Sequence, residues 1–274
     1  MLETVQARTP QGTLLELPLM GVVSGYNITN IEGLDPVKAT LVSSSFANMD
    51  GEQYHSSRRE TRNIVLTISL EPDYIGTTVQ TLRRDLYDFF MPKSLVNLRF
   101  MMDDGLEADI QARVETFETP LFSKEPEVSI SLICFDPDFF DATAVVVAAS
   151  STNGATETTI HYGGSVETGA LLQLNINQTI NALTVYHRDP SGTLRSLDLQ
   201  TPMINGDIVK ISSETGNKYA RKTTGGSESS ALYAVSPQSY WLKLQPGENT
   251  IRVYTTSGTP IPYTLTYLTR YGGL

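Results

Sequence analysis

Hydrophobic and polar residues alternate along much of this chain, which is the pattern of β-strands. In residues 63–70, isoleucine or leucine occupies every second position, with polar residues or valine between them. Successive side chains of a strand point to opposite faces of a sheet, so this segment predicts a strand with one buried face. Residues 53–62 before it are mostly polar and include three arginines and a histidine. We expect a cationic loop there, suited to contact rather than to catalysis.

One segment has the spacing of a helix instead. Between residues 79 and 90, apolar side chains recur at steps of three and four. Thr77 or Thr78 can cap its start, and Pro92 ends it because proline cannot continue a helix. The sequence therefore predicts one helix that lies against a sheet.

The other periodic segments all alternate as strands do. They are residues 95–102, 106–117, 128–134, 170–177, 183–187, 193–199, 207–212, 231–235, 240–244, 249–254 and 262–270. The turn residues Asp103-Asp104-Gly105 join the first two as a hairpin. Regularly spaced short strands with turns between them are typical of β-sandwiches.

The composition changes after residue 140. The strand at 128–134 ends in an aspartate-proline-aromatic sequence, and alanine, serine, threonine and asparagine dominate as far as residue 154. A chain of 274 residues suits two domains of ordinary size. We therefore expect a mainly β protein, with an N-terminal β-sandwich that carries one helix in residues 1–140 and a second β-sandwich in residues 141–274.

Charge and composition exclude several classes of protein. The net charge of −10 opposes nonspecific binding of nucleic acid. The single cysteine, Cys134, cannot form an intrachain disulfide, and its place in an apolar strand predicts a buried thiol. The longest apolar run, residues 144–149, is far shorter than the ~20 residues of a membrane span. We expect a soluble protein made in a cytoplasm.

No motif for catalysis or for a cofactor emerges from the residues. His55, His161 and His187 lie in unrelated segments without zinc-ligand spacing, and the acidic turn at 103–109 lacks the spacing of a calcium loop. His55 also lacks the strand-turn-helix context of a nucleophile elbow. We expect no catalytic residue, no cofactor and no metal. Trp241 lies in an expected strand, where a tryptophan either anchors the core or, as the weaker alternative, stacks on a glycan.

Four stretches resemble the distal tail protein (Dit) family of long non-contractile phage tails. They are SSSFANMDGEQYHSSRRETRNIVLTISL (43–70), SLICFDPDFF (131–140), YWLKLQPGENTIRVY (240–254) and PYTLTYLTRYGGL (262–274). The resemblance implies a structural virion protein whose N-terminal sandwich closes into a hexameric ring, with a galectin-like or carbohydrate-module-like C-terminal sandwich. Its implied partners are other copies of the chain, the tail tube protein, and a tail hub, tip or fibre protein. The ring would join the tube to the tail tip or baseplate.

A closed ring needs two different complementary patches on each copy. The candidates for one patch are Tyr54, His55, Arg58, Arg59 and Arg62. The alternative for this stretch is a solvated charged loop. An acidic ring also suits a conduit for DNA, because walls of like charge do not hold the passing phosphates.

Two rival functions remain open. One is a carbohydrate-binding tail module in which the second sandwich recognises glycan on the host surface. The other is a glycoside-cleaving tail enzyme, which needs two paired carboxylates. Glu228 and Glu248 are available, but the sequence gives no reason to pair them.

Overall fold

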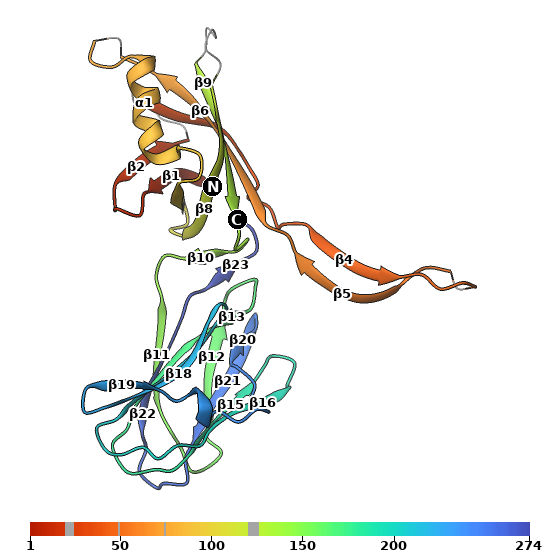
Figure 1. Ribbon diagram of the computed structural model, residues 1–274, viewed down its shortest axis with the longest axis vertical. Coiled ribbons are helices and arrows are strands. Elements are labelled where there is room, and N and C mark those ends of the chain that lie inside the picture. Colours follow the sequence, from red (N-terminus) through yellow and green to blue (C-terminus); the bar gives the residue numbers. More distant parts are fainter. Residues whose placement is uncertain (20–24, 49, 74, 120–125) are drawn as a thin grey trace. The chain divides into compact units, whose positions relative to one another are not determined.

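The computed structural model describes residues 1–19, 25–48, 50–73, 75–119 and 126–274. These residues form a mainly β protein with one α-helix, which confirms the expected fold class (Figure 1). The chain divides into two compact units, Met1–Ala142 together with Tyr271–Leu274 (unit 1), and Thr143–Arg270 (unit 2). The last four residues therefore pack with the first unit, although the sequence assigned them to the second domain.

Unit 1 is built on one antiparallel sheet with the strand order β2-β1-β7-β8-β9-β6-β3. Its strands are β1 (Leu2–Arg8), β2 (Leu14–Pro18), β3 (Gly25–Glu32), β6 (Arg62–Glu71), β7 (Leu95–Met102), β8 (Glu107–Glu118) and β9 (Glu127–Cys134). A short strand, β10 (Phe139–Asp141), pairs with the start of β8. The alternation predicted for β6 and β9 is confirmed, because every second side chain in each strand is buried. The predicted hairpin of β7 and β8 is also present.

The helix α1 (Val79–Phe90) packs its apolar side against the buried face of this sheet. Thr78 is its N-cap, and the Thr78 hydroxyl accepts a hydrogen bond from the Thr81 amide at 3.2 Å. Leu82, Leu86 and Phe90 are buried in the core that the helix shares with the sheet. Full burial of each such side chain stabilises the fold by about 1.5 to 3 kcal/mol. The predicted helix is thus confirmed, including its spacing and its cap.

Unit 2 is a β-sandwich. One sheet, in spatial order, contains β11 (Val145–Ser150), β22 (Pro262–Tyr267), β14 (Leu171–Asn175), β17 (Ile208–Glu214), β18 (Asn217–Thr224) and β19 (Ser227–Ser230). The other contains β12 (Thr158–Tyr162), β21 (Gly247–Tyr254), β15 (Leu183–Arg188) and β16 (Leu194–Leu199). The short strands β13 (Thr168–Gly169) and β20 (Lys243–Leu244) pair with each other, and β23 (Arg270–Tyr271) lies near the end of the chain. Apolar side chains of both large sheets form one core between them.

Two sequence predictions for unit 2 are wrong or incomplete. Residues 231–235 were expected as a strand but form the 3-10 helix η1 (Leu232–Ala234). Ala231 and Ala234, three residues apart, are buried, while the side chains between them are exposed; that is the period of a 3-10 helix. Of residues 240–244, only Lys243–Leu244 is a strand.

The strands β12, β18 and β19 were not predicted from the sequence. Gly225 and Gly226 form the two-residue turn between β18 and β19. Both have positive φ angles, 57° and 85°, as such a hairpin turn requires. The flanking strands escaped notice because β19 is entirely exposed and carries no apolar alternation.

Candidate assembly surface

The segment that the sequence marked as a cationic loop is largely a strand. Within the described residues, β4 (Ala39–Ser44) and β5 (Gln53–Arg59) pair only with each other, and we call this hairpin the arm. The arm extends away from the sheet of unit 1 (Figure 1). Every residue of β5 is exposed, so the arm has no buried face.

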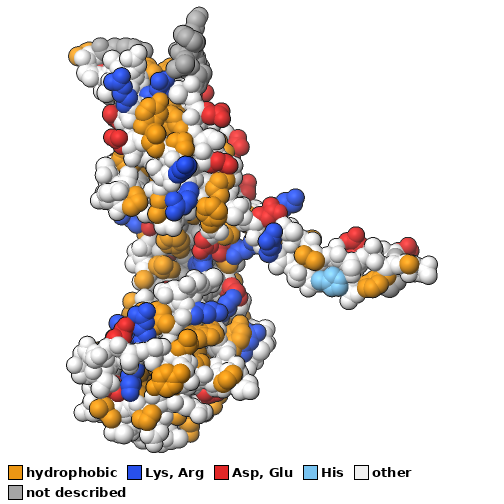
Figure 2. All heavy atoms as spheres, viewed as in Figure 1, with side chains coloured by type: hydrophobic (Ala, Val, Ile, Leu, Met, Phe, Trp, Pro, Cys, Tyr) orange, Lys and Arg blue, Asp and Glu red, His pale blue; other side chains and the backbone are white. Residues whose placement is uncertain are grey.

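The arm nevertheless carries large apolar side chains. Leu41 is 66% exposed, Phe46 is 50% exposed and Tyr54 is 59% exposed. Apolar side chains reach the surface along the arm, beside a histidine (Figure 2). An isolated two-stranded hairpin is marginally stable in water, and a third strand or a packing partner is what normally secures it. The arm therefore has the properties of a segment that another surface covers.

Polar side chains of the arm bond mainly within it. On one face the Tyr54 hydroxyl donates to the Ser57 hydroxyl at 2.8 Å. On the other face the Ser44 hydroxyl and the His55 Nε2 atom lie 2.6 Å apart. A β-bulge between Val42 and Ser43 shifts the register near these groups. His55 is the extra residue of β5 at this bulge, because Val42 pairs with Ser56 and Ser43 pairs with Tyr54.

Arg59 ties the arm to the rest of unit 1. Its guanidinium makes a two-pronged ion pair with Asp138, whose carboxylate is almost completely buried; the Nη2 to Oδ2 distance is 2.8 Å. The Glu60 amide donates to the Lys38 carbonyl at 3.0 Å and closes the base of the arm. Two parallel N–H···O bonds fix orientation as well as position. Arg59 therefore fixes the base of the arm to the rest of unit 1.

Arg62 is buried and does not lie on the arm's surface, so it is a poor contact for another copy. Its side chain is only 1% exposed and donates to four carbonyl oxygens. They belong to Gly33, Asp35, Pro137 and Gly272. The guanidinium also lies over the Phe139 ring, 4.4 Å from its centre. Burial lowers the pKa of Arg62, because the charged form loses its water.

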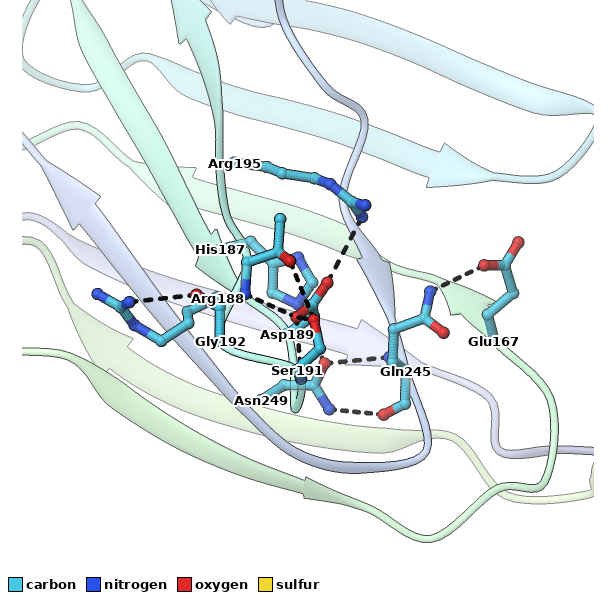
Figure 3. Close-up of polar contacts among 10 residues, drawn as sticks. Glu167, His187, Arg188, Asp189, Ser191, Gly192, Arg195, Gln245 and Asn249 are labelled. Carbon is cyan, nitrogen blue, oxygen red and sulfur yellow. Dashed lines mark hydrogen bonds and ion pairs between the residues drawn. The ribbon is translucent and has the colours of Figure 1, made fainter.

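A second polar cluster lies in unit 2 and centres on His187 (Figure 3). His187 is 2% exposed, and its Nε2 atom lies 3.0 Å from the Asn249 Oδ1 atom. That oxygen also accepts from the Gln245 amide, so Nε2 carries the proton and donates. The Nδ1 atom has no hydrogen-bond partner in the described part of the chain. Burial lowers the pKa of His187 and keeps the ring neutral.

The neighbouring Asp189 organises a turn rather than a catalytic group. Its Oδ1 atom accepts from the Ser191 amide at 3.0 Å, the Ser191 hydroxyl at 2.5 Å and the Thr193 amide at 2.9 Å. The hydrogen bond from the Ser191 hydroxyl is the largest cause that lowers the pKa of Asp189 below its ordinary value, and the backbone amides of Thr193 and Ser191 lower it further. Arg195 completes the cluster at 3.8 Å from Asp189. The serine bonds to the aspartate and the histidine bonds to an amide, so no serine-to-histidine relay forms here.

The remaining candidates lie apart. Trp241 is half-buried against the core of unit 2, just before β20 rather than within a strand. Glu228 lies on β19 and pairs with Arg221 at 2.8 Å, whereas Glu248 lies on β21 in the other sheet. Among the residues that the structure describes, no group of three or more histidine, cysteine or acidic side chains is placed to hold a metal ion. In the same part of the chain, no helix has the length and apolar character to span a bilayer.

A known protein family matches part of the chain. Residues 163–271 match the family model described as the siphovirus-type tail component, C-terminal domain. No curated protein matches the sequence significantly. The family match confirms the resemblance to the Dit family over residues 163–271.

Solved structures share the fold of the chain. The crystal structure of the Dit protein of phage SPP1, described as a hub adsorption apparatus in phages that infect Gram-positive hosts, matches with a TM-score of 0.67. The sequences are 15% identical, and the match covers 90% of this chain and 93% of that one. A chain of the phage P2 baseplate, in its activated conformation with Ca, matches with a TM-score of 0.52 and 9% identity over the full length of both chains.

Proposed function

Since residues 163–271 carry the C-terminal domain of siphovirus-type tail components and the chain has the fold of a Dit protein, we propose that its copies assemble into a hexameric ring. The ring would join the tail tube to the tail tip or baseplate, with the tube protein on one side and a hub, tip or fibre protein on the other. DNA would pass through it. The role is one of assembly, without catalysis.

The observation that carries this proposal is the arm. It exposes Leu41, Phe46 and Tyr54 on a hairpin that no other described strand joins. In a ring with head-to-tail contacts, an extended segment of one copy fits a different surface of the next. Covering these side chains would remove their apolar area from water, at about 25 cal/mol for each Å² buried. We therefore assign the arm to the contact between neighbouring copies, with Tyr54, His55 and Arg58 on its surface.

The test is the mass of the assembly in solution. Light scattering coupled to size-exclusion chromatography, followed by negative-stain imaging, should show six copies in a ring for the wild-type protein. Leu41→Asp places a charge on the arm and should shift the protein to single copies. The matched control is Val146→Asp on β11 in unit 2, where the valine is 61% exposed. That variant should still form rings.

Two results would count against the proposal. A wild-type protein that stays single at high concentration lacks the assembly altogether. A ring that survives Leu41→Asp forms through another surface, and the arm then has a different partner. Circular dichroism on both variants verifies that the substitution leaves the fold intact.

A further inference from the structure

Two short connections join the arm to the sheet of unit 1. Residues 33–38 lead from β3 into β4, and residues 60–61 lead from β5 into β6. Neither connection is part of a helix or a strand. The arm lies beside no other strand of the described chain, so the contacts made by these connections decide how freely it moves.

Residues 271–274 pack against the first connection, and we call them the clasp. They belong to unit 1, although the whole of unit 2 precedes them in the sequence. The Leu274 amide donates to the Leu34 carbonyl at 3.0 Å, and the end marked C lies at the base of the arm (Figure 1). Tyr271 and Leu274 also pack against the core of unit 1. The clasp is thus anchored in the core and bonded to the connection.

The clasp and the first connection touch closely at Gly273. A Cβ atom added at Gly273 would lie 2.8 Å from the Pro36 Cδ atom and 2.9 Å from the Pro36 nitrogen. Atoms cannot approach so closely, so any side chain at position 273 would push the two segments apart. Glycine allows this close approach of two backbones.

Arg62 bonds to the connection and to the clasp at the same time. Its guanidinium donates to the Gly33 carbonyl and, at 2.7 Å, to the Asp35 carbonyl, both in the first connection. It also donates to the Gly272 carbonyl of the clasp at 2.7 Å. Arg62 is the first residue of β6, directly after the second connection. One rigid, planar group therefore holds both connections and the clasp together.

These contacts restrain residues 33–36 one after another. Arg62 holds Gly33 and Asp35, whereas Leu34 and Pro36 are held by the clasp. A backbone segment that loses such contacts regains conformational freedom. Arg59 would still tie the end of β5 to Asp138, so the arm would remain attached but would turn about its base.

We propose that residues 271–274 act as a clasp that holds the arm in one orientation, and that release of the clasp leaves the arm free to swing. All of these contacts lie within one copy of the chain, so the proposal stands whether or not the copies form a ring. Its benefit for any contact of the arm is preorganisation. An arm that is already fixed loses less entropy when it binds a partner.

The experiment measures the orientation of the arm by double electron–electron resonance between two spin labels on the full-length protein. The labels are attached at Ser56→Cys on the arm and Gln111→Cys on β8, both exposed positions, while the buried Cys134 stays unlabelled. Every sample carries Leu41→Asp, which removes the proposed contact between copies. An excess of unlabelled protein ensures that only distances within one copy are detected.

With the clasp intact, the distance distribution should be narrow. Gly273→Val should widen it about twofold or split it, and residues 33–38 should exchange their amide hydrogens about tenfold faster or more, because the connection opens locally. The matched control is Gly258→Val in unit 2, where an added Cβ meets no atom within 4 Å. That variant should change neither measurement.

A second variant tests the clasp in a different way. Removal of Leu274 deletes the bond to Leu34 but keeps the Gly272 carbonyl for Arg62, and it should also widen the distribution. In both variants α1 and β9 should keep their slow exchange, since only the base of the arm is released. The proposal is overturned if the distribution is broad with the clasp intact, if it stays narrow in both variants, or if α1 and β9 exchange as fast as residues 33–38. Should Gly273→Val fail to fold, removal of Leu274 decides the question alone.

Discussion

Replacing Arg62 with methionine should destabilise unit 1 strongly. The methionine fills the space of the aliphatic stem but donates no hydrogen bond, so four carbonyl oxygens lose their partner. Three of these bonds, to Asp35, Pro137 and Gly272, measure 2.7 Å. Each buried carbonyl left without a donor costs about 1 kcal/mol or more, which sums to about 4 kcal/mol.

An opposing effect reduces this figure. Removing the guanidinium also removes the cost of holding a charge away from water, a cost that can offset much of what a buried charge contributes. We expect a net loss of about 3 kcal/mol, a large part of the roughly 5 to 15 kcal/mol that stabilises a typical domain. The stability of Arg62→Lys should lie between that of the wild type and that of Arg62→Met. An ammonium group has three donors but cannot reproduce the planar fork of the guanidinium.

Hydrogen exchange followed by mass spectrometry is the suitable assay, because it separates the two units. The single tryptophan, Trp241, lies in unit 2 and does not report on unit 1. In Arg62→Met, exchange should accelerate in residues 62–71 and in residues 271–274, which the guanidinium holds through Gly272. The matched control, Arg84→Met on the exposed side of α1, should stay within about 0.5 kcal/mol of the wild type. An Arg62→Met protein as stable as this control would refute the reasoning.

Three further predictions concern other positions in the two units. Gly33→Ala should destabilise unit 1 by more than about 2 kcal/mol, because Gly33 has a φ of +89° and an added Cβ would lie 2.0 Å from the Asn63 carbonyl oxygen. The control is Gly12→Ala, which has a similar φ of +91° but open space around the added Cβ, and it should cost only about 1 kcal/mol. Urea unfolding measures both free energies. Burial holds the pKa of His187 below its ordinary value of about 6.5. As the pH falls below about 6.5, the histidine of the unfolded chain therefore binds a proton before the histidine of the folded unit does. The stability of unit 2 should therefore be complete above about pH 6.5 and fall as the pH drops toward the folded pKa; urea unfolding followed by tryptophan fluorescence should show this slope, and a His187→Gln protein that keeps the same slope would exclude this histidine as its source. Burial raises the pKa of the Cys134 thiol to about 12, so a thiol reagent at neutral pH should label the protein only in denaturant, and rapid labelling of the native protein would contradict that burial.

The sequence determined those parts of the fold in which one strand or helix face is buried. Residues 63–70 and 128–134 alternate because one side of each strand faces the core, and residues 79–90 repeat at helical spacing for the same reason. A local pattern of this kind is visible in the sequence whichever strand or helix packs against the buried face. Strand β5 was not predicted as a strand because neither of its faces is buried within the chain. Without burial there is no alternation to detect, although charge and turn residues did mark the segment as a surface for contact.

Only the tertiary structure decided the environment of Arg62 and the place of a groove in unit 2. Arg62 was grouped with exposed arginines, since a charged side chain is rarely buried, and its acceptors come from three separate segments of the chain. Every residue has a backbone carbonyl, so the sequence does not show which carbonyls will lie close together in the fold. The groove in unit 2 likewise brings together residues 179–184 and residues 254–257, which become neighbours only when β15 and β21 pair. Local patterns record which faces avoid water, whereas sites built from distant segments depend on contacts that the folded chain alone creates.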